Sequence, residues 1–153
     1  MLLEYWKNPT GTAEKFAGGW LLTGDLGRMD EDGYFWFVSR ADDVITSSGY
    51  RIGPVEIEDC LSKHPAVALS AAIGEPDPVR TEIIKVLIVL AEGHDPSPDL
   101  ETDIREFVRS RLAAHECPRE VAFVDDLPTT TTGKVIRRVL RRADAERIER
   151  EST

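Results

Sequence analysis

Two apolar runs in the middle of the chain constrain the fold more than any other feature. They cover residues 67–73 and 83–90, and Pro and Gly residues bound both of them. Apolar runs of this length, without strict alternation of apolar and polar residues, are typical of buried strands. We therefore predict two buried strands, joined by a loop that displays Arg80.

Helical patterns flank these strands. Gly53-Pro54 predicts the start of a helix that runs to about Lys63, because proline is favoured in a first turn. Ser97-Pro98 predicts the start of another helix, whose apolar residues recur at helical spacing and form one core-facing stripe. Residues 121–124 supply a third strand, and Lys134 opens a closing helix. The expected fold class is α+β, a small three-stranded sheet with about three helices against one face.

Aromatic residues are dense in the N-terminal part of the chain. Residues 34–38 alternate after turn-forming residues at 30–33, which predicts a β-hairpin. Trp6, Trp20 and Trp36 belong to the same part. If a larger domain normally covers this hairpin, its absence leaves the three tryptophans partly exposed or lets them mediate an artificial dimer.

A hydroxyl-rich loop precedes the closing helix. Its sequence is Leu127-Pro-Thr-Thr-Thr-Thr-Gly-Lys134, so that the lysine directly follows a glycine. An ammonium on a flexible stem can neutralise phosphate or carboxylate oxygens as charge builds on them. The phosphate-binding pattern G-x-x-x-x-G-K-[ST] is excluded, since Pro128 occupies the first glycine position and Val135 follows the lysine. An ordinary loop whose threonines cap the next helix is the alternative.

Two further segments precede this loop in a recognisable order. One is Thr23-Gly24-Asp25, and the other is the run from Arg40 to Glu58 with Ser-Ser-Gly-Tyr-Arg-Ile-Gly-Pro at its centre. Together with the lysine loop they resemble the closing third of acyl-CoA synthetases in the adenylate-forming superfamily, particularly the medium-chain branch. The resemblance extends from about Tyr5 to about Arg142.

The resemblance implies an AMP-forming acid–thiol ligase. A carboxylic acid reacts with ATP to give an acyl-adenylate, and coenzyme A then displaces AMP to give a thioester. Residues 42–153 would be a mobile C-terminal domain that pivots at Asp42 against a large N-terminal domain. Residues 1–41 would be the hairpin and lead that end the larger domain. The chain on its own is therefore expected to be inactive.

The same resemblance implies residues that bind ATP or AMP. Lys134 matches the adenylation lysine, which bridges the substrate carboxylate and the α-phosphate. Asp25 matches the carboxylate that accepts hydrogen bonds from the ribose hydroxyls, and Arg40 matches its partner on the nucleotide. Arg51 matches an arginine that reaches the ATP phosphates. Without the resemblance, Asp25 could merely cap a turn, and Arg40 could pair with either aspartate that follows it.

Five other residues match positions that contact coenzyme A. Ser48, Gly49 and Tyr50 match the segment that lines the pantetheine tunnel, where a glycine lets a ligand approach the main chain. Arg80 and Arg119 match positions near the coenzyme A nucleotide, where guanidinium groups suit phosphates. The alternatives are a simple turn with a left-handed glycine and two solvated arginines.

Three residues depart from the family pattern near this proposed surface. Many family members carry a glycine where Thr81 stands and basic residues where Glu116 and Thr129 stand. Glu116 in particular would repel an anionic cofactor. Two alternatives therefore remain: a ligase with another acceptor, such as a carrier protein, and a non-catalytic interaction module.

Composition excludes other partners. A net charge of -9 argues against nucleic acid and an anionic membrane, and the arginines near the C-terminus are expected to form a solvated helix face. The two cysteines lie far apart and the histidines show no ligand spacing, so no protein-bound metal is implied, and magnesium would arrive with ATP. With no membrane-length apolar run and no secretion signal, a cytoplasmic location is expected. The C-terminal arginines that we expect on the solvated helix face are Arg137, Arg138, Arg141, Arg142, Arg147 and Arg150.

Overall fold

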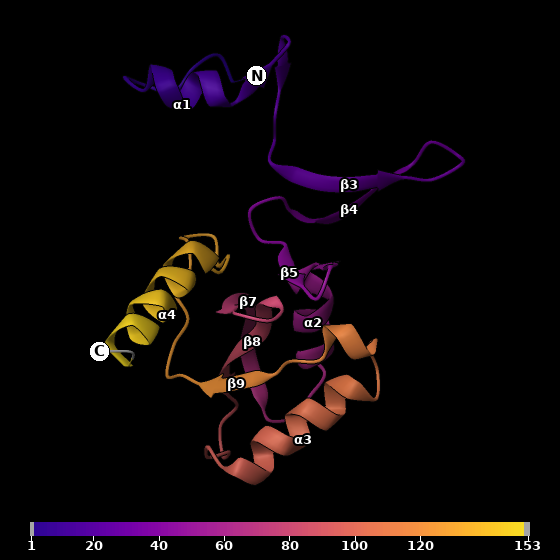
Figure 1. The fold of residues 1–153 in the computed structure, drawn as a ribbon, viewed down its shortest axis with the longest axis vertical. Helices are drawn as coiled ribbons and strands as arrows, with labels where there is room; N and C mark the ends of the chain where they lie inside the picture. Colours follow the sequence, from indigo (N-terminus) through magenta and orange to yellow (C-terminus); the bar gives the residue numbers. More distant parts are fainter. Residues whose placement is uncertain (1, 152–153) are drawn as a thin grey trace. The chain divides into compact units, whose positions relative to one another are not determined.

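The computed structural model describes residues 2–151, and the chain divides into two compact units. The first unit is Met1–Asp42 and the second is Asp43–Thr153. Figure 1 shows the elements of both. Among the described residues, no helix combines the length and apolar character that crossing a membrane requires.

The second unit is built on a five-stranded sheet. The three predicted strands are present, but the predicted number is wrong, because a hairpin of two three-residue strands joins the same sheet. β8 is the central strand. It pairs antiparallel with β7 along one edge. Along the other edge it pairs antiparallel with β5 and parallel with β9. The strands are β5 (Ile45–Ser47), β6 (Tyr50–Ile52), β7 (Val67–Asp77), β8 (Thr81–Leu90) and β9 (Glu120–Phe123).

Helices cover both faces of this sheet, so the prediction of helices against a single face is wrong. Successive strand residues enter opposite apolar clusters: Ala72 and Val86 belong to one, with Ile104, and Ala71 belongs to the other, with Leu140. Burial on both faces explains why the two strand sequences do not alternate. Figure 1 shows α4 on one side of the sheet and α2 and α3 on the other. The helices are α2 (Pro54–Leu61), α3 (Pro98–Arg109), the short 3-10 helix η1 (Ala114–Glu116) and α4 (Arg137–Glu151).

A buried ion cluster joins α4 to the sheet. Lys85 is 2% exposed, and its Nζ lies 2.7 Å from both Glu75 Oε2 and Asp144 Oδ1. Glu120 is a third partner, and Arg147 pairs with the same carboxylates. Burial opposes the charge on Lys85, but the hydrogen bonds to these carboxylates outweigh it and raise the Lys85 pKa. The cluster therefore ties three strands to the second half of α4.

The first unit contains short elements without a comparable core. The predicted hairpin is present as β3 and β4, and a short helix and a two-residue strand pair precede it. Trp6, Trp20 and Trp36 are 84%, 79% and 53% exposed, which confirms the predicted exposure. Dimer formation through them remains a prediction. The elements are α1 (Pro9–Glu14), β1 (Phe16–Ala17), β2 (Trp20–Leu21), β3 (Asp25–Met29) and β4 (Phe35–Arg40).

Candidate functional site

The lysine loop is a tight turn that is held by hydrogen bonds between its own residues. Its ends meet where Thr129 pairs with Val135, and the Thr130 amide donates to the Lys134 carbonyl at 2.8 Å. The Thr130 hydroxyl accepts from the Lys134 amide at 3.1 Å, so this threonine stabilises the loop itself. Gly133 has φ +80°, a conformation that glycine adopts at little cost. Because Val135 pairs with Thr129, α4 begins at 137, three residues later than predicted.

The Lys134 side chain is exposed at the surface of the second unit. Within the part of the chain that the structure describes, no carboxylate lies within ion-pair distance of its ammonium. A cation held on an ordered loop without an internal partner is available to an external anion. An ammonium buried in the interior would have excluded this role.

Asp25 and Arg40 meet across the β3–β4 pair. Arg40 Nη1 donates to Asp25 Oδ1 at 2.9 Å and to the Thr23 carbonyl at 3.0 Å, and Arg40 Nε lies 3.4 Å from Asp42 Oδ1. The hydrogen bond that Arg40 donates to Asp25 raises the Arg40 pKa. Gly24 has φ +81°, and a Cβ there would lie 2.8 Å from Arg40 Nη2. The positive φ therefore favours a glycine here, and any larger residue would also have to displace the Arg40 guanidinium.

The hairpin between β5 and β6 places two of the predicted coenzyme A residues. Ser47 pairs with Tyr50, so Ser48 and Gly49 form a two-residue loop in which both residues have positive φ, 50° and 84°. This is the backbone of a type I′ hairpin turn, which suits the twist of paired strands. The Ser48 amide donates to the Arg80 carbonyl at 3.0 Å. The predicted turn is thus confirmed, and it is docked on the β7–β8 loop.

A small pocket brings together four of the five predicted coenzyme A residues. Ser48, Tyr50, Arg80 and Arg119 line a volume of about 70 Å³, while Gly49 is not among the lining residues. The Tyr50 ring stacks on His115, with the ring centroids 4.1 Å apart and the planes at 13°. His115 was missed from the sequence, where it shows no spacing that would single it out. Hydroxyl, aromatic and guanidinium groups therefore line one opening.

The Arg80 side of this pocket is held by local contacts. Asp77 Oδ1 accepts from the amides of Val79 and Arg80 at 3.0 and 2.7 Å, and these backbone hydrogen bonds lower the Asp77 pKa. Thr81 follows with φ 74°, which is unusual for a β-branched residue. Hydrogen bonds from backbone amides to the Asp77 side chain thus hold the loop that displays Arg80.

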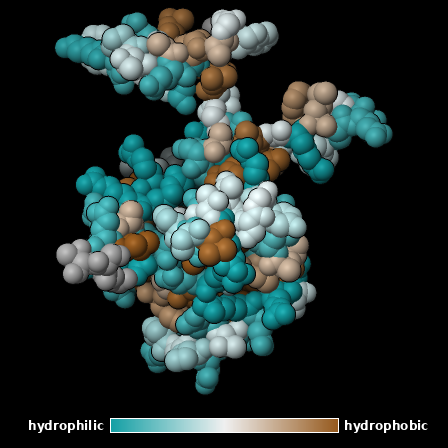
Figure 2. All heavy atoms as spheres, in the orientation of Figure 1, coloured by the Kyte–Doolittle hydropathy of each residue, from teal (hydrophilic) through white to brown (hydrophobic). Residues whose placement is uncertain are grey.

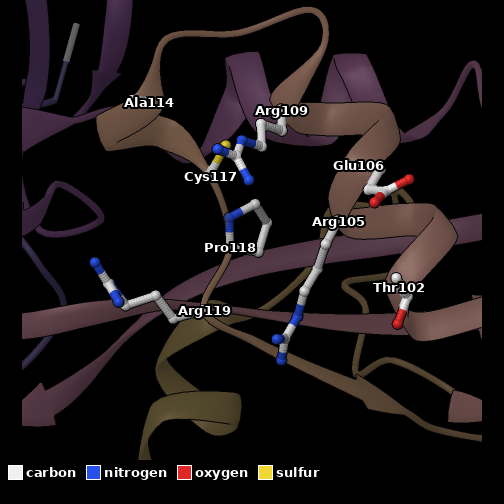
Figure 3. Close-up of a pocket in the computed structure, with 8 residues that line it drawn as sticks. All are labelled: Thr102, Arg105, Glu106, Arg109, Ala114, Cys117, Pro118 and Arg119. Carbon is white, nitrogen blue, oxygen red and sulfur yellow. The ribbon is translucent and has the colours of Figure 1, made fainter.

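A larger pocket of about 490 Å³ adjoins the first one, because Cys117 and Arg119 line both. Figure 3 shows α3 supplying Arg105 and Arg109 on one side of Pro118. These two arginines were missed because they lie on the polar side of an amphipathic helix, where sequence indicates only solvent. Burial raises the pKa of the Cys117 thiol, which therefore forms part of the wall as a neutral group.

The remaining predicted residues lie outside both pockets. Arg51 is exposed on β6, and Asp42 is exposed at the boundary between the two units. Glu116 Oε2 accepts from the Ala113 amide at 2.9 Å, so this carboxylate is engaged with its own helix start. Lys134 is not among the lining residues of either pocket.

Comparison with known proteins identifies relatives of the whole arrangement. Residues 56–134 match the family described as AMP-binding enzyme C-terminal domain. Over 92% of its length the chain is 53% identical to the acetyl-coenzyme A synthetase of Bacillus subtilis (strain 168), and over 94% it is 47% identical to the mitochondrial acyl-coenzyme A synthetase ACSM3 of Mus musculus. It spans 25% of the length of each.

Solved structures give the same result. The anthranilate CoA ligase AuaEII, in complex with anthranoyl-AMP, matches with a TM-score of 0.82 and 41% identity over 93% of this chain and 28% of that one. An ATP-bound RpMatB-BxBclM chimera matches with a TM-score of 0.81 and 38% identity over 92% of this chain and 28% of that one.

Proposed function

Because the chain belongs to the family of AMP-binding enzyme C-terminal domains, we propose that it completes an AMP-forming acyl-CoA synthetase. Residues 42–153 are the mobile domain of that enzyme, and residues 1–41 end its larger N-terminal domain. The intact enzyme converts a carboxylic acid and ATP, with magnesium on the phosphates, to an acyl-adenylate. It then transfers the acyl group to coenzyme A. A cytoplasmic location stays a prediction, since one relative named above is mitochondrial.

The convergence of Ser48, Tyr50, Arg80 and Arg119 on one pocket is the observation that carries this proposal. Coenzyme A combines a thin, mostly uncharged arm with a phosphorylated nucleotide. The aromatic and hydroxyl groups suit the arm, and guanidinium forks suit the phosphates. The adjoining pocket adds Arg109, so the cationic surface extends away from the smaller opening.

Lys134 supplies the cation for the adenylation step. Its ammonium is exposed on an ordered loop and unpaired within the described residues, so it can enter a cleft of the N-terminal domain. There it bridges the attacking carboxylate and the α-phosphate, which positions the two anions and stabilises charge in the transition state. No proton transfer by the lysine is required.

The other nucleotide contacts have supporting geometry. Arg40 holds the Asp25 carboxylate at 2.9 Å, and an acceptor-only group suits the two ribose hydroxyls. Arg51 is exposed and can reach the ATP phosphates. Asp42 lies at the junction of the units, where a hinge residue absorbs backbone rotation.

A ligase with another acceptor is the second candidate, and Glu116 is the residue that bears on it. Its negative charge would oppose coenzyme A, but the hydrogen bond from the Ala113 amide turns the carboxylate toward the helix start. This contact weakens the case against coenzyme A as the acceptor. Assaying thioester formation by the intact enzyme with free coenzyme A, and separately with a carrier protein, distinguishes the two candidates.

The lysine role is tested by separating the two half-reactions. In the enzyme that carries this chain with its N-terminal domain, Lys134→Ala should slow adenylation by about 10²–10³-fold, the scale of losing one preorganised electrostatic group. Thioester formation from supplied acyl-adenylate should change by less than about two-fold, because that step does not use the ammonium. Pyrophosphate exchange and single-turnover thioester assays measure the two rates.

Lys63→Ala is the matched control. Lys63 is exposed on the same unit, outside both pockets, and both half-reactions should be unchanged. Equal losses in both half-reactions for Lys134→Ala would contradict the proposal, and so would an undiminished adenylation rate, which the interaction-module alternative predicts.

A further inference from the structure

Arg137 has the most extensively paired guanidinium near the lysine loop. Its Nη1 lies 3.2 Å from Asp43 Oδ2, its Nε lies 3.2 Å from Glu58 Oε1, and its Nη2 donates to Glu58 Oε2. Arg141, one turn further along α4, reaches the other oxygen of Asp43 at 2.9 Å. The Arg137 side chain is 15% exposed, and those of Asp43 and Glu58 are 12% and 17% exposed. We call Asp43, Glu58 and Arg137 the clamp.

The clamp connects parts of the unit that lie far apart in the sequence. Asp43 directly follows Asp42, the proposed hinge residue, and Glu58 belongs to α2. Glu58 Oε1 also accepts from the Ala72 amide at 2.8 Å, which extends the connection to β7. Arg137 is the first residue of α4, three residues after Lys134. The start of the mobile unit and the base of the lysine loop therefore share one set of ion pairs.

The chemistry of the clamp requires an arginine. Burial raises the pKa of the Glu58 carboxyl, and the hydrogen bonds from Arg137 oppose this effect. A planar guanidinium can bind both oxygens of Glu58 and still reach Asp43, whereas a lysine ammonium is a single point charge. Neutralising Arg137 removes the cation that Asp43 and Glu58 share, and only Asp43 keeps another arginine partner, Arg141.

The rest of α4 has separate anchors. Leu140 packs in the second apolar cluster, and Asp144 pairs with buried Lys85. Loss of the clamp should therefore displace the first turn of α4 while the helix stays docked. Hydrogen bonds within the lysine loop hold its shape, and only Val135 and Ile136 separate Lys134 from α4. The Ile136 amide donates to the Pro128 carbonyl at 2.7 Å. A displaced first turn would therefore shift the end of the loop next to Lys134, while Leu127 keeps the other end in the second apolar cluster.

We propose that Arg137 is a positioning residue for adenylation: through Asp43 and Glu58 it sets where the Lys134 ammonium lies relative to the hinge. This inference rests on the proposed function of Lys134. The clamp matters in the step that uses the lysine and is dispensable in the step that does not.

The test is a double-mutant cycle in the enzyme that carries this chain with its N-terminal domain. Arg137→Gln should slow adenylation by about 10–100-fold, the scale expected when a catalytic group is misplaced by about 1 Å. Thioester formation from supplied acyl-adenylate should change by less than about two-fold. Lys134→Ala combined with Arg137→Gln should be no slower than Lys134→Ala alone, because a positioning residue has no effect once its target is removed.

Arg138→Gln is the matched control, since Arg138 is exposed on the same turn and has no ion-pair partner within residues 2–151. Losses that multiply in the double mutant would overturn the inference, as would equal losses in both half-reactions. If Lys134→Ala alone leaves adenylation unchanged, the proposed function fails instead. Should Arg137→Gln not fold, Arg137→Lys replaces it, with a smaller adenylation loss expected and an unchanged rate counting against the inference.

Discussion

The two units of the chain differ in how they bury apolar surface. In the second unit, apolar clusters on both faces of the sheet contain buried side chains from three helices and five strands. In the first unit, α1 has no buried residue, and the β4 residues Phe35 and Phe37 are 81% and 61% exposed. Figure 2 shows brown, apolar side chains at the surface of the first unit.

This difference indicates which part of the chain specifies its own structure. Two-stranded hairpins are marginal without a covered face, and large exposed apolar surfaces mark interaction sites. The exposed apolar residues of the first unit are therefore typical of a surface that packs against another domain or chain. The second unit contains both sides of its own core.

The sharpest test of this comparison is amide hydrogen exchange on the chain. Amides in β8 should exchange about 10⁴-fold more slowly than free peptide, because opening this central strand requires global unfolding of a domain with ordinary stability. Amides in β3 and β4 should exchange at least about 100-fold faster than those in β8, since local opening suffices there. Mass spectrometry of the exchanging chain measures both. Equal protection would show that the first unit is stabilised independently.

A substitution at Lys85 should reduce the stability of the second unit alone. Lys85→Met leaves Glu75 and Asp144 buried without their central cation, and breaking a buried ion cluster in this way costs about 3–5 kcal/mol. Urea denaturation followed by circular dichroism measures the free energy of unfolding. Lys63→Met, at an exposed position, serves as the control and should have little effect. A loss below about 1 kcal/mol would place this cluster among ordinary surface pairs.

The smallest expected effect is an acid transition confined to the first unit. Asp30 accepts from the Trp36 indole at 2.7 Å and from the Tyr34 amide at 2.9 Å, and these bonds, the indole first, lower the Asp30 pKa below 3.8. A lowered carboxyl pKa stabilises the hairpin above pH 3.8, and this contribution is lost as the pH falls through the folded-state pKa.

Trp36 fluorescence reports this transition in a background of Trp6→Phe and Trp20→Phe. The emission should be constant down to about pH 4 and change only below it. Asp30→Asn cannot titrate and should abolish the change. A transition that persists in this variant would have to be assigned to another carboxyl group.

The sequence predicted the strands of the second unit better than their limits. β7 continues past Ile73 to Asp77, through Gly74 and Pro76, which both read as strand breakers. A Cβ at Gly74 would lie 2.5 Å from the Glu82 carboxyl carbon, so the glycine leaves room for the Glu82 side chain of the neighbouring strand. Pro76 is tolerated because β7 is an edge strand. Both effects depend on cross-strand contacts that no local pattern contains.

The arginines of α4 show the same limit at the site. A solvated helix face was predicted, and Arg138 and Arg142 are exposed as expected. Arg137, Arg141 and Arg147 instead pair with carboxylates from other elements. The partners of Arg137 lie 79 and 94 residues away, so only the folded chain reveals them. The motif residues that share the small pocket were found because their order along the chain resembles that of a known family.

Thr81 has a consequence for the wall of that pocket. A threonine with φ 74° is under conformational strain, of a kind that costs about 1–3 kcal/mol. The loop between β7 and β8 therefore contains a strained residue next to Arg80, whose carbonyl accepts a hydrogen bond from the Ser48 amide. A glycine at this position would relieve the strain and would make the backbone of the loop more flexible. Thr81 therefore lowers the stability of the folded chain and at the same time restricts the backbone next to Arg80.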